Sequence, residues 1–225
     1  MMLIEQIRQK QQSQSDFYTS RGLHVYFKDP LVNDEIDAED LIANMESRLP
    51  PHLLEEIEMI IFGWFEEFVD RNLSAFYDSG TVYVSNLQDD PENMLDDILH
   101  EVAHSLEGPR GYDIYADEKI KQEFLRKREY LHDILWKNGF KAPKSFFVDP
   151  EYNKEFDEFL YETVGYDTLS RLVAGMFVSA YAPTSLREYF ATGFVVFYLN
   201  SADHEFLKKM SPQLYEKINL LHNKE

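Results

Sequence analysis

Residues 90–107 read Asp-Pro-Glu-Asn-Met-Leu-Asp-Asp-Ile-Leu-His-Glu-Val-Ala-His-Ser-Leu-Glu, and the rest of the chain can be organised around them. Asp90 suits a helix N-cap and Pro91 suits the first helical position, whereas Gly108 suits a helix end. The stretch also carries apolar residues on most sides of a helix: Leu95, Ile98, Leu99, Val102, Ala103 and Leu106. The sequence therefore predicts a largely buried helix over 90–107. A buried helix that carries two histidines and a glutamate needs a reason for their burial.

Within that helix, residues 100–104 read His-Glu-Val-Ala-His, which is the HExxH pattern. His100 and His104 are four residues apart, so they lie on one face, one turn apart. Two imidazoles at this spacing can hold one zinc ion, and Glu101 can accept a proton from a water bound to that metal. Ordinary surface residues can produce the same pattern, but the cap, the stop and the apolar context favour a zinc site.

Several residues are candidates for the third metal ligand. The metzincin arrangement needs Gly at 107 and His at 110, and Glu107 and Arg110 stand there, so that class is excluded. Glu188 is the strongest candidate, although Ser185 and Glu188 also match a capping box, Ser-x-x-Glu, which would explain the glutamate without a metal. The remaining candidates, each of which is more often a plain surface residue, are Asp113, Asp117, His132, His204 and His222.

Residues 181–204, YAPTSLREYFATGFVVFYLNSADH, resemble a region near the end of the catalytic domain of anthrax lethal factor. They are also similar to the Pro-Pro endopeptidases of the same zinc metallopeptidase family. In that family a Tyr precedes the metal-binding Glu by seven residues, as Tyr181 precedes Glu188, and two aromatic residues and Ala follow it, as Tyr189, Phe190 and Ala191 do here. Ser105, Leu106 and Glu107 match the residues after the family's HExxH motif, and Gly80 to Val84 match a short strand before it.

The resemblance covers about 40% of the chain, roughly 76–107 and 170–222, and implies a zincin-like metallopeptidase of the gluzincin type. It implies zinc bound by His100, His104 and Glu188, with water in the open position. It also implies Tyr181 as a catalytic group that donates a hydrogen bond to the developing oxyanion. Two departures stand out: Thr192 replaces an acid that lethal factor carries four residues after its metal-binding Glu, and 84 residues separate His104 from Glu188. A helical insertion at about 117–165 accounts for that separation.

Two further roles can be read from positions along the chain. Glu107 stands one turn after His104 and is a candidate second-shell acceptor for a ligand histidine, with a solvated acid at a helix end as the alternative. The predicted strand Thr81 to Ser85 can pair with an extended peptide, which makes Tyr83 and Val84 candidate substrate-binding residues. An ordinary core or edge strand explains the same sequence.

The expected fold class is α+β and mostly helical, with a small sheet packed on the HEVAH helix. Apolar spacing predicts a helical face over 53–68, and helices over 117–138, 168–180 and 185–199, with a last one from Ser211-Pro212. Strand signals are limited to 23–27 and to a hairpin of residues 76–77 and 81–85 around Asp78-Ser79-Gly80. We expect a single domain over 1–225, in which 1–75 is mainly helical and 76–225 forms the metallopeptidase core.

The composition excludes several classes of binding partner. The 225 residues include 22 basic and 41 acidic side chains, so the net charge is −19, which argues against nucleic acid and anionic membranes as partners. No cysteine is present, which excludes a Cys-ligated zinc and a thiol nucleophile. The sequence shows no signal peptide or apolar segment long enough to span a bilayer, so a cytoplasmic location is expected. A peptide or protein substrate is the expected partner.

A zinc metalloendopeptidase that uses Glu101 as general base is therefore the leading functional hypothesis. A catalytically silent zincin-fold binding module is one alternative, although all the catalytic residue types are present. A zinc hydrolase of a non-peptide amide is another, and it should have a closed pocket instead of an open cleft. A purely structural acidic helical protein is the last, and it requires a protein without metal.

Overall fold

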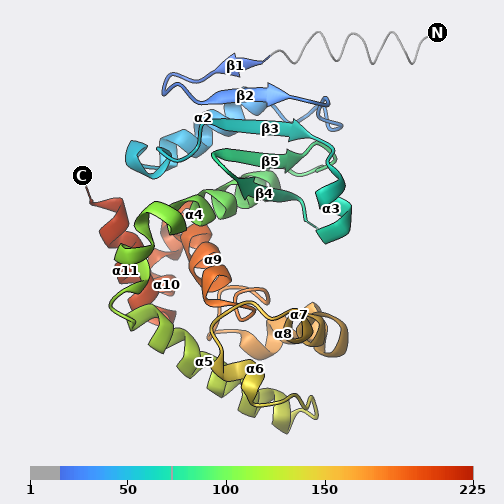
Figure 1. The fold of residues 1–225 in the computed structure, drawn as a ribbon, viewed down its shortest axis with the longest axis vertical. Helices are drawn as coiled ribbons and strands as arrows, with labels where there is room; N and C mark the ends of the chain where they lie inside the picture. Colours follow the sequence, from blue (N-terminus) through green and yellow to red (C-terminus); the bar gives the residue numbers. More distant parts are fainter. Residues whose placement is uncertain (1–15, 72, 225) are drawn as a thin grey trace, which may run out of the picture. The chain divides into compact units, whose positions relative to one another are not determined.

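Short apolar runs in the first half of the chain form a five-stranded sheet in the computed structural model, which describes residues 16–71 and 73–224 (Figure 1). The strands lie side by side in the order β1-β2-β3-β5-β4. β2, β3 and β5 are mutually parallel, and β1 and β4 run antiparallel to their neighbours at the two edges. The strands are β1 (Phe17–Tyr18), β2 (His24–Phe27), β3 (Met59–Gly63), β4 (Ala75–Asp78) and β5 (Thr81–Ser85).

The alternation of side chains gives the sheet one buried face. Val25, Ile60 and Val82 stand opposite one another on β2, β3 and β5 and are fully buried. The next row on the other face holds Ile61 and Tyr83, with Phe76 of β4 stacked on Tyr83 at 4.5 Å between ring centroids. The hairpin predicted around Asp78-Ser79-Gly80 is confirmed. Its two turn residues both have positive φ, 47° and 86°, as a tight two-residue turn between twisted strands requires.

The chain forms two compact units, one ending at Leu106 and the other comprising Glu107–Lys224. The first unit contains the sheet together with helix α2 (Ala38–Arg48), the short 3₁₀ turn η1 (Pro51–Leu53) and α3 (Glu66–Arg71). The longest helix, α4 (Pro91–Tyr115), begins in the first unit and ends in the second.

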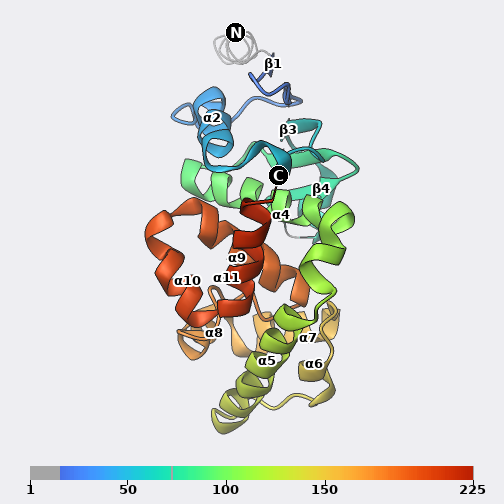
Figure 2. The same cartoon turned by 90° about the vertical axis from the view of Figure 1, so that its left-hand side faces the viewer.

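The second unit is helical, and Figure 2 shows α9 beside α10 and α11. Its core is built where α5, α9 and α11 meet, and Phe124, Phe194 and Ile218 are fully buried there. After α4 its elements are α5 (Lys119–Lys137), α6 (Ser145–Val148), α7 (Lys154–Glu158), the π-helical turn η2 (Phe159–Val164), α8 (Tyr166–Val173), α9 (Leu186–Leu199), η3 (Ser201–Asp203), α10 (His204–Met210) and α11 (Pro212–His222).

The α+β, mostly helical class is confirmed. The strand at 23–27 and the helices at 117–138, 185–199 and from Pro212 are also found, within one or two residues of the predicted bounds. The segment 117–165 is largely helical, and its status as an insertion stays a prediction. None of the described helices is both long and apolar enough to traverse a lipid bilayer.

Four predictions about elements were wrong. The helical face predicted over 53–68 is instead η1, β3 and the start of α3, because β3 lies between two parallel strands and its apolar residues are consecutive. Residues 16–75 therefore carry three strands and are not mainly helical, and 1–15 lie outside the described residues. Helix α4 continues past Gly108 to Tyr115, with Pro109 inside it and Ile114 fully buried. Helix α8 ends at Val173, because Gly175 has a φ of +77° that a helix cannot contain.

Candidate metal centre

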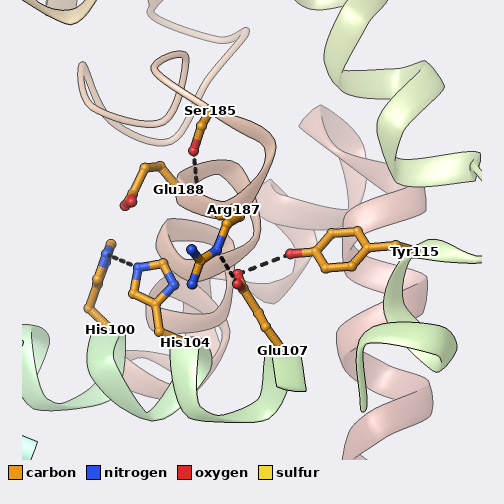
Figure 3. A network of polar contacts seen from close by, with 7 residues as sticks. All are labelled: His100, His104, Glu107, Tyr115, Ser185, Arg187 and Glu188. Carbon is orange, nitrogen blue, oxygen red and sulfur yellow. Dashed lines mark hydrogen bonds and ion pairs between the residues drawn. The ribbon is translucent and has the colours of Figure 1, made fainter. Parts of the chain in front are cut away.

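The two histidines of the HEVAH segment lie on helix α4, which begins where the sequence predicts. The Oδ1 atom of Asp90 accepts the backbone N–H of Glu92 at 2.8 Å, and the Asp90 carbonyl accepts Met94 N–H at 3.0 Å. The Nε2 atoms of His100 and His104 are 3.1 Å apart, one helical turn from each other (Figure 3). Two nitrogen ligands of one tetrahedral zinc, each at about 2.0–2.1 Å, stand roughly 3.3 Å apart. The pair therefore already has the spacing of two zinc ligands.

Glu188 stands in the first turn of α9, and Ser185 is the N-cap of that helix. Ser185 has extended backbone angles, and its Oγ accepts the Glu188 backbone N–H at 3.1 Å. This is one half of the capping box that the sequence predicts. Figure 3 shows the Glu188 carboxylate extending away from the Ser185 hydroxyl.

One ligand atom from each of His100, His104 and Glu188 lies within 4.8 Å of the others. All three residues are partly buried, neither fully enclosed nor fully exposed. Over residues 16–71 and 73–224 this is the one group of three or more such side chains with metal-binding spacing. Two imidazole nitrogens and a carboxylate oxygen are a donor set that suits zinc and leaves a fourth coordination position open. The donor atoms that the sequence predicts are thus brought together.

The other candidates for the third ligand are engaged elsewhere. Their partners are Lys224 Nζ for the Asp113 carboxylate (2.5 Å), Lys217 Nζ for Asp117 (3.0 Å), Asp133 for His132 Nδ1 (3.4 Å), the Phe197 carbonyl for His204 Nε2 (2.7 Å) and the Tyr198 hydroxyl for His222 Nδ1 (3.1 Å).

Glu101 meets the edge strand of the sheet. The backbone N–H of Tyr77, in β4, donates a hydrogen bond of 2.8 Å to Oε2 of Glu101. A carboxylate that accepts a backbone N–H is held in a defined orientation. The edge strand and the helix therefore cooperate to position the residue predicted to be the general base, a partnership with no signal in the sequence.

Glu107 lies among polar partners at the second half of α4 (Figure 3). Its carboxylate pairs with Nε of Arg187 and accepts a hydrogen bond of 3.1 Å from the Tyr115 hydroxyl. Burial, and then the charge of Glu107, raises the pKa of Tyr115, which therefore stays a hydrogen-bond donor. The predicted support of a ligand histidine by Glu107 stays a prediction. Arg187, the residue just before Glu188, is a partner of Glu107 that no pattern in the sequence indicates.

Tyr181 lies in the loop that leads into α9. Its carbonyl accepts the Thr184 backbone N–H at 3.0 Å and the Thr184 hydroxyl at 2.9 Å, which forms the turn before Ser185. Burial raises the pKa of the Tyr181 phenol, and the nearby Glu188 carboxylate raises it further. The phenol is therefore protonated at neutral pH and can donate a hydrogen bond, as the resemblance implies it does.

The substrate-pairing role expected of residues 81–85 must be corrected. β5 pairs with β3 on one side and with β4 on the other, so its backbone has no open edge. The Val84 side chain is fully buried, and Tyr83 packs against Phe76 and Phe65. The edge strand beside α4 is β4, which was predicted only as the partner in the hairpin.

A second set of acids lies before the histidines on α4. Burial, followed by the negative charge of Asp96, raises the pKa of Asp97 to about 6. These acids border a cavity of about 500 Å³ that is also lined by Ser74 and Ser85. The Asp96-Asp97 pair carries no distinctive signal in the sequence, because two adjacent acids on a helix are common on solvated faces.

Comparison with known protein families, with curated proteins and with solved structures finds no match to this chain.

Proposed function

We propose that the protein is a zinc-dependent metalloendopeptidase with a zincin-like, gluzincin-type catalytic domain. The observation that carries the proposal is the approach of one ligand atom each from His100, His104 and Glu188 to within 4.8 Å, with Glu101 next to the first ligand. Three protein ligands and an open position are the arrangement of catalytic zinc sites, whereas structural zinc sites fill all four positions. A glutamate beside such a site is what peptide hydrolysis requires.

His100, His104 and Glu188 would hold the metal. Bound zinc supplies Lewis acidity, which polarises a carbonyl and lowers the pKa of a water molecule. The close approach of the two Nε2 atoms, 3.1 Å, supports this assignment, because two neutral imidazoles turn their lone pairs toward one point when both are ligands.

Glu101 would carry the proton through the reaction. It accepts a proton from the attacking water as the new C–O bond forms at the scissile carbonyl. It then gives that proton to the leaving amine as the C–N bond breaks, so the carboxylate is regenerated. The hydrogen bond from Tyr77 N–H to Oε2 orients the carboxylate that would act as base.

Tyr181 would donate a hydrogen bond to the carbonyl oxygen as negative charge develops on it. Its raised pKa favours this role, because a phenol that stays protonated at neutral pH keeps its donor. The adjoining Thr184 turn fixes the Tyr181 backbone seven residues before Glu188.

Strand β4 would bind the peptide. Within the described sheet it pairs only with β5, and an edge strand can accept an extended peptide by backbone hydrogen bonds. Because Tyr77 of β4 touches Glu101, a peptide on this edge would run past the proposed base.

A degenerate peptide library, digested by protein loaded with one equivalent of zinc and read by mass spectrometry, tests the proposal. Glu101→Gln removes the base while keeping its size. Glu129→Gln is the matched control, because Glu129 is an exposed helical glutamate that pairs loosely with Lys144 at 3.8 Å. We expect the wild type and Glu129→Gln to cleave, and Glu101→Gln to be slower by about 10²–10⁴-fold.

Equal cleavage by Glu101→Gln and the wild type would remove Glu101 as the base. Wild-type protein that binds no zinc would contradict the metal centre itself. Zinc binding without cleavage by any variant would contradict an endopeptidase and favour a binding role for the same fold.

A further inference from the structure

Every residue next to Glu188 in the first turn of α9 is tied to another part of the second unit. The Leu186 backbone N–H donates to the Pro150 carbonyl at 2.8 Å. Arg187 pairs with Glu107 through Nε. The residue after Glu188, Tyr189, has no exposed surface, although its hydroxyl is polar. A buried hydroxyl needs hydrogen-bond partners, and the identity of these partners carries the argument.

The Tyr189 hydroxyl is held by two charged residues of α5. It donates to Oε1 of Glu123 at 2.9 Å and accepts from Nζ of Lys127 at 2.7 Å. Glu123 is itself buried, with 5% of its surface exposed. The Lys127 ammonium also lies 4.8 Å from the centre of the Tyr189 ring. The proton and one lone pair of the phenol are therefore directed by fixed partners.

The same two charged residues fasten the start of α11. Glu123 Oε2 accepts the Gln213 backbone N–H at 2.9 Å, and Oε1 accepts Leu214 N–H at 3.2 Å. Lys127 Nζ also donates to the Ser211 hydroxyl at 2.6 Å. Amide groups that the first turn of α11 cannot satisfy internally are thus capped by Glu123. The phenol of Tyr189 is therefore hydrogen-bonded to two residues of α5 that also hold the start of α11.

Because Tyr189 is next to Glu188 on α9, the hydrogen bonds of Tyr189 also restrict where the Glu188 carboxylate lies. Rotation of α9 by about 20° about its axis would move a carboxylate about 7 Å from that axis by roughly 2 Å. Metal–ligand distances tolerate only about 0.2 Å. Directional hydrogen bonds to a buried group add to the resistance that close packing already offers to such a rotation.

We propose that Tyr189, clamped by Glu123 and Lys127, is a positioning residue that sets the rotation of α9 and so aims the Glu188 carboxylate at the metal. This inference rests on the proposed zinc centre. Tyr189 and its two partners do not touch the reacting atoms. Removing the Tyr189 hydroxyl should therefore act first on the binding of the metal.

The test is a pair of matched variants on one helix, Tyr189→Phe and Tyr198→Phe. Both delete one hydroxyl from a buried tyrosine of α9, since Tyr198 is 5% exposed and its hydroxyl lies 3.1 Å from His222 Nδ1. Zinc affinity is measured by competition with a chelator. The visible absorption of bound Co²⁺ reports the ligand geometry. The melting temperature reports the loss of stability that both variants should show.

We expect both variants to melt a few degrees lower, because each loses a buried hydrogen bond. Tyr189→Phe should also weaken zinc binding by about 10–100-fold and alter the Co²⁺ spectrum, since supporting partners of ligands have effects of that size. Tyr198→Phe should keep the wild-type zinc affinity within about twofold.

Wild-type zinc affinity and an unchanged Co²⁺ spectrum in Tyr189→Phe would overturn the positioning role and leave the metal centre standing. A wild-type protein that does not bind zinc would overturn the proposed function, and the inference with it. If Tyr189→Phe does not fold, Lys127→Met takes its place, because it removes one of the two partners of the phenol. Unchanged zinc binding in Lys127→Met would then overturn the inference.

Discussion

Lys127 is held in an environment that disfavours its charge. Burial lowers the pKa of its ammonium to about 8, and the nearby Glu123 carboxylate opposes part of that effect. Its neighbours are the Tyr189 and Ser211 hydroxyls and the faces of the Phe177 and Tyr189 rings. A neutral amine can still donate to both hydroxyls, so the hydrogen bonds do not require the charge.

The contribution of Lys127 to stability should therefore rise with pH between about 8 and 10.5. In that window Lys127 is deprotonated in the folded chain and protonated in the unfolded one, so the unfolded state binds more protons. The whole shift is worth up to about 3 kcal/mol. In urea unfolding at a series of pH values, the stability of Lys127→Met relative to the wild type should fall by about 2 kcal/mol from pH 8 to pH 10.

Lys119→Met is the control for that series. Lys119 is 54% exposed at its side chain and loosely paired with Asp117 at 3.9 Å. Its difference from the wild type should be nearly flat over the same range. A flat difference for Lys127→Met as well would show that the lysine keeps an ordinary pKa.

The sequence predicts the metal ligands of the site but not the residues whose hydrogen bonds hold the site in place. His100, Glu101 and His104 are predicted because a helical turn brings them together and the chemistry follows from the residue types. The bonds that hold the site join residues far apart: Glu107 and Arg187 are 80 positions apart, and Tyr77 and Glu101 are 24 apart. No local pattern relates such residues, and a backbone N–H, as in Tyr77, is a donor that every non-proline residue carries.

The same limit explains why β3 was predicted as a helix. The spacing of Ile57, Ile61 and Trp64 matches a helical face, yet the run Met59–Gly63 pairs on both sides in the sheet. All five residues of this strand, Met-Ile-Ile-Phe-Gly, are non-polar although their burial alternates, so the sequence lacks the polar–apolar alternation by which strands are recognised. The hairpin of β4 and β5 was predictable because its turn residues need positive φ, and Ser-Gly supplies it.

Helices α9 and α11 approach each other at Gly193. A Cβ atom there would lie 2.3 Å from Cδ2 and 2.9 Å from Cγ of Leu214, which is fully buried. Glycine lowers helix stability, so its presence inside α9 is explained by this contact. Gly111, inside α4, has no atom within 4 Å of the same position and is not followed by proline, so it is a natural comparison.

Gly193→Ala and Gly111→Ala should therefore change stability in opposite directions. Gly111→Ala should stabilise the protein by about 0.5–1 kcal/mol through helix propensity and the reduced freedom of the unfolded chain. Gly193→Ala should destabilise it by about 1–3 kcal/mol, because Leu214 must leave its rotamer. Urea unfolding of both variants measures the two effects. A stabilising Gly193→Ala would mean that the two helices separate at little cost.

The whole chain carries a net charge of −19, distributed over 225 residues. Such an excess keeps a protein soluble and steers cationic partners toward it, but it also makes the folded state repel itself. Several acids already use the available lysines, as in the pairs Asp113–Lys224 and Asp117–Lys217. The 41 acidic residues outnumber the 22 basic ones by 19, so one-to-one pairing cannot neutralise all of the acids.

Salt should therefore stabilise the fold at neutral pH. Raising NaCl from about 0.01 M to 0.5 M shortens the screening length from about 30 Å to a few Å. We expect a gain on the order of 1 kcal/mol, which corresponds to a melting temperature higher by about 2–4 °C. Sucrose of equal osmolality is the control, because it leaves screening unchanged. A melting temperature that falls with NaCl would contradict a fold limited by self-repulsion.

The close fit of α9 on α11 also bears on ancestry. Glu123 binds Tyr189 66 positions away and Leu214 91 positions away, and Gly193 leaves Leu214 its room. A larger side chain at 193 requires a smaller one at 214, and a lost acid at 123 leaves the lysine at 127 with a buried charge. These positions must therefore change together. Covariation at these positions should therefore identify distant homologues of this chain even where few other residues are identical.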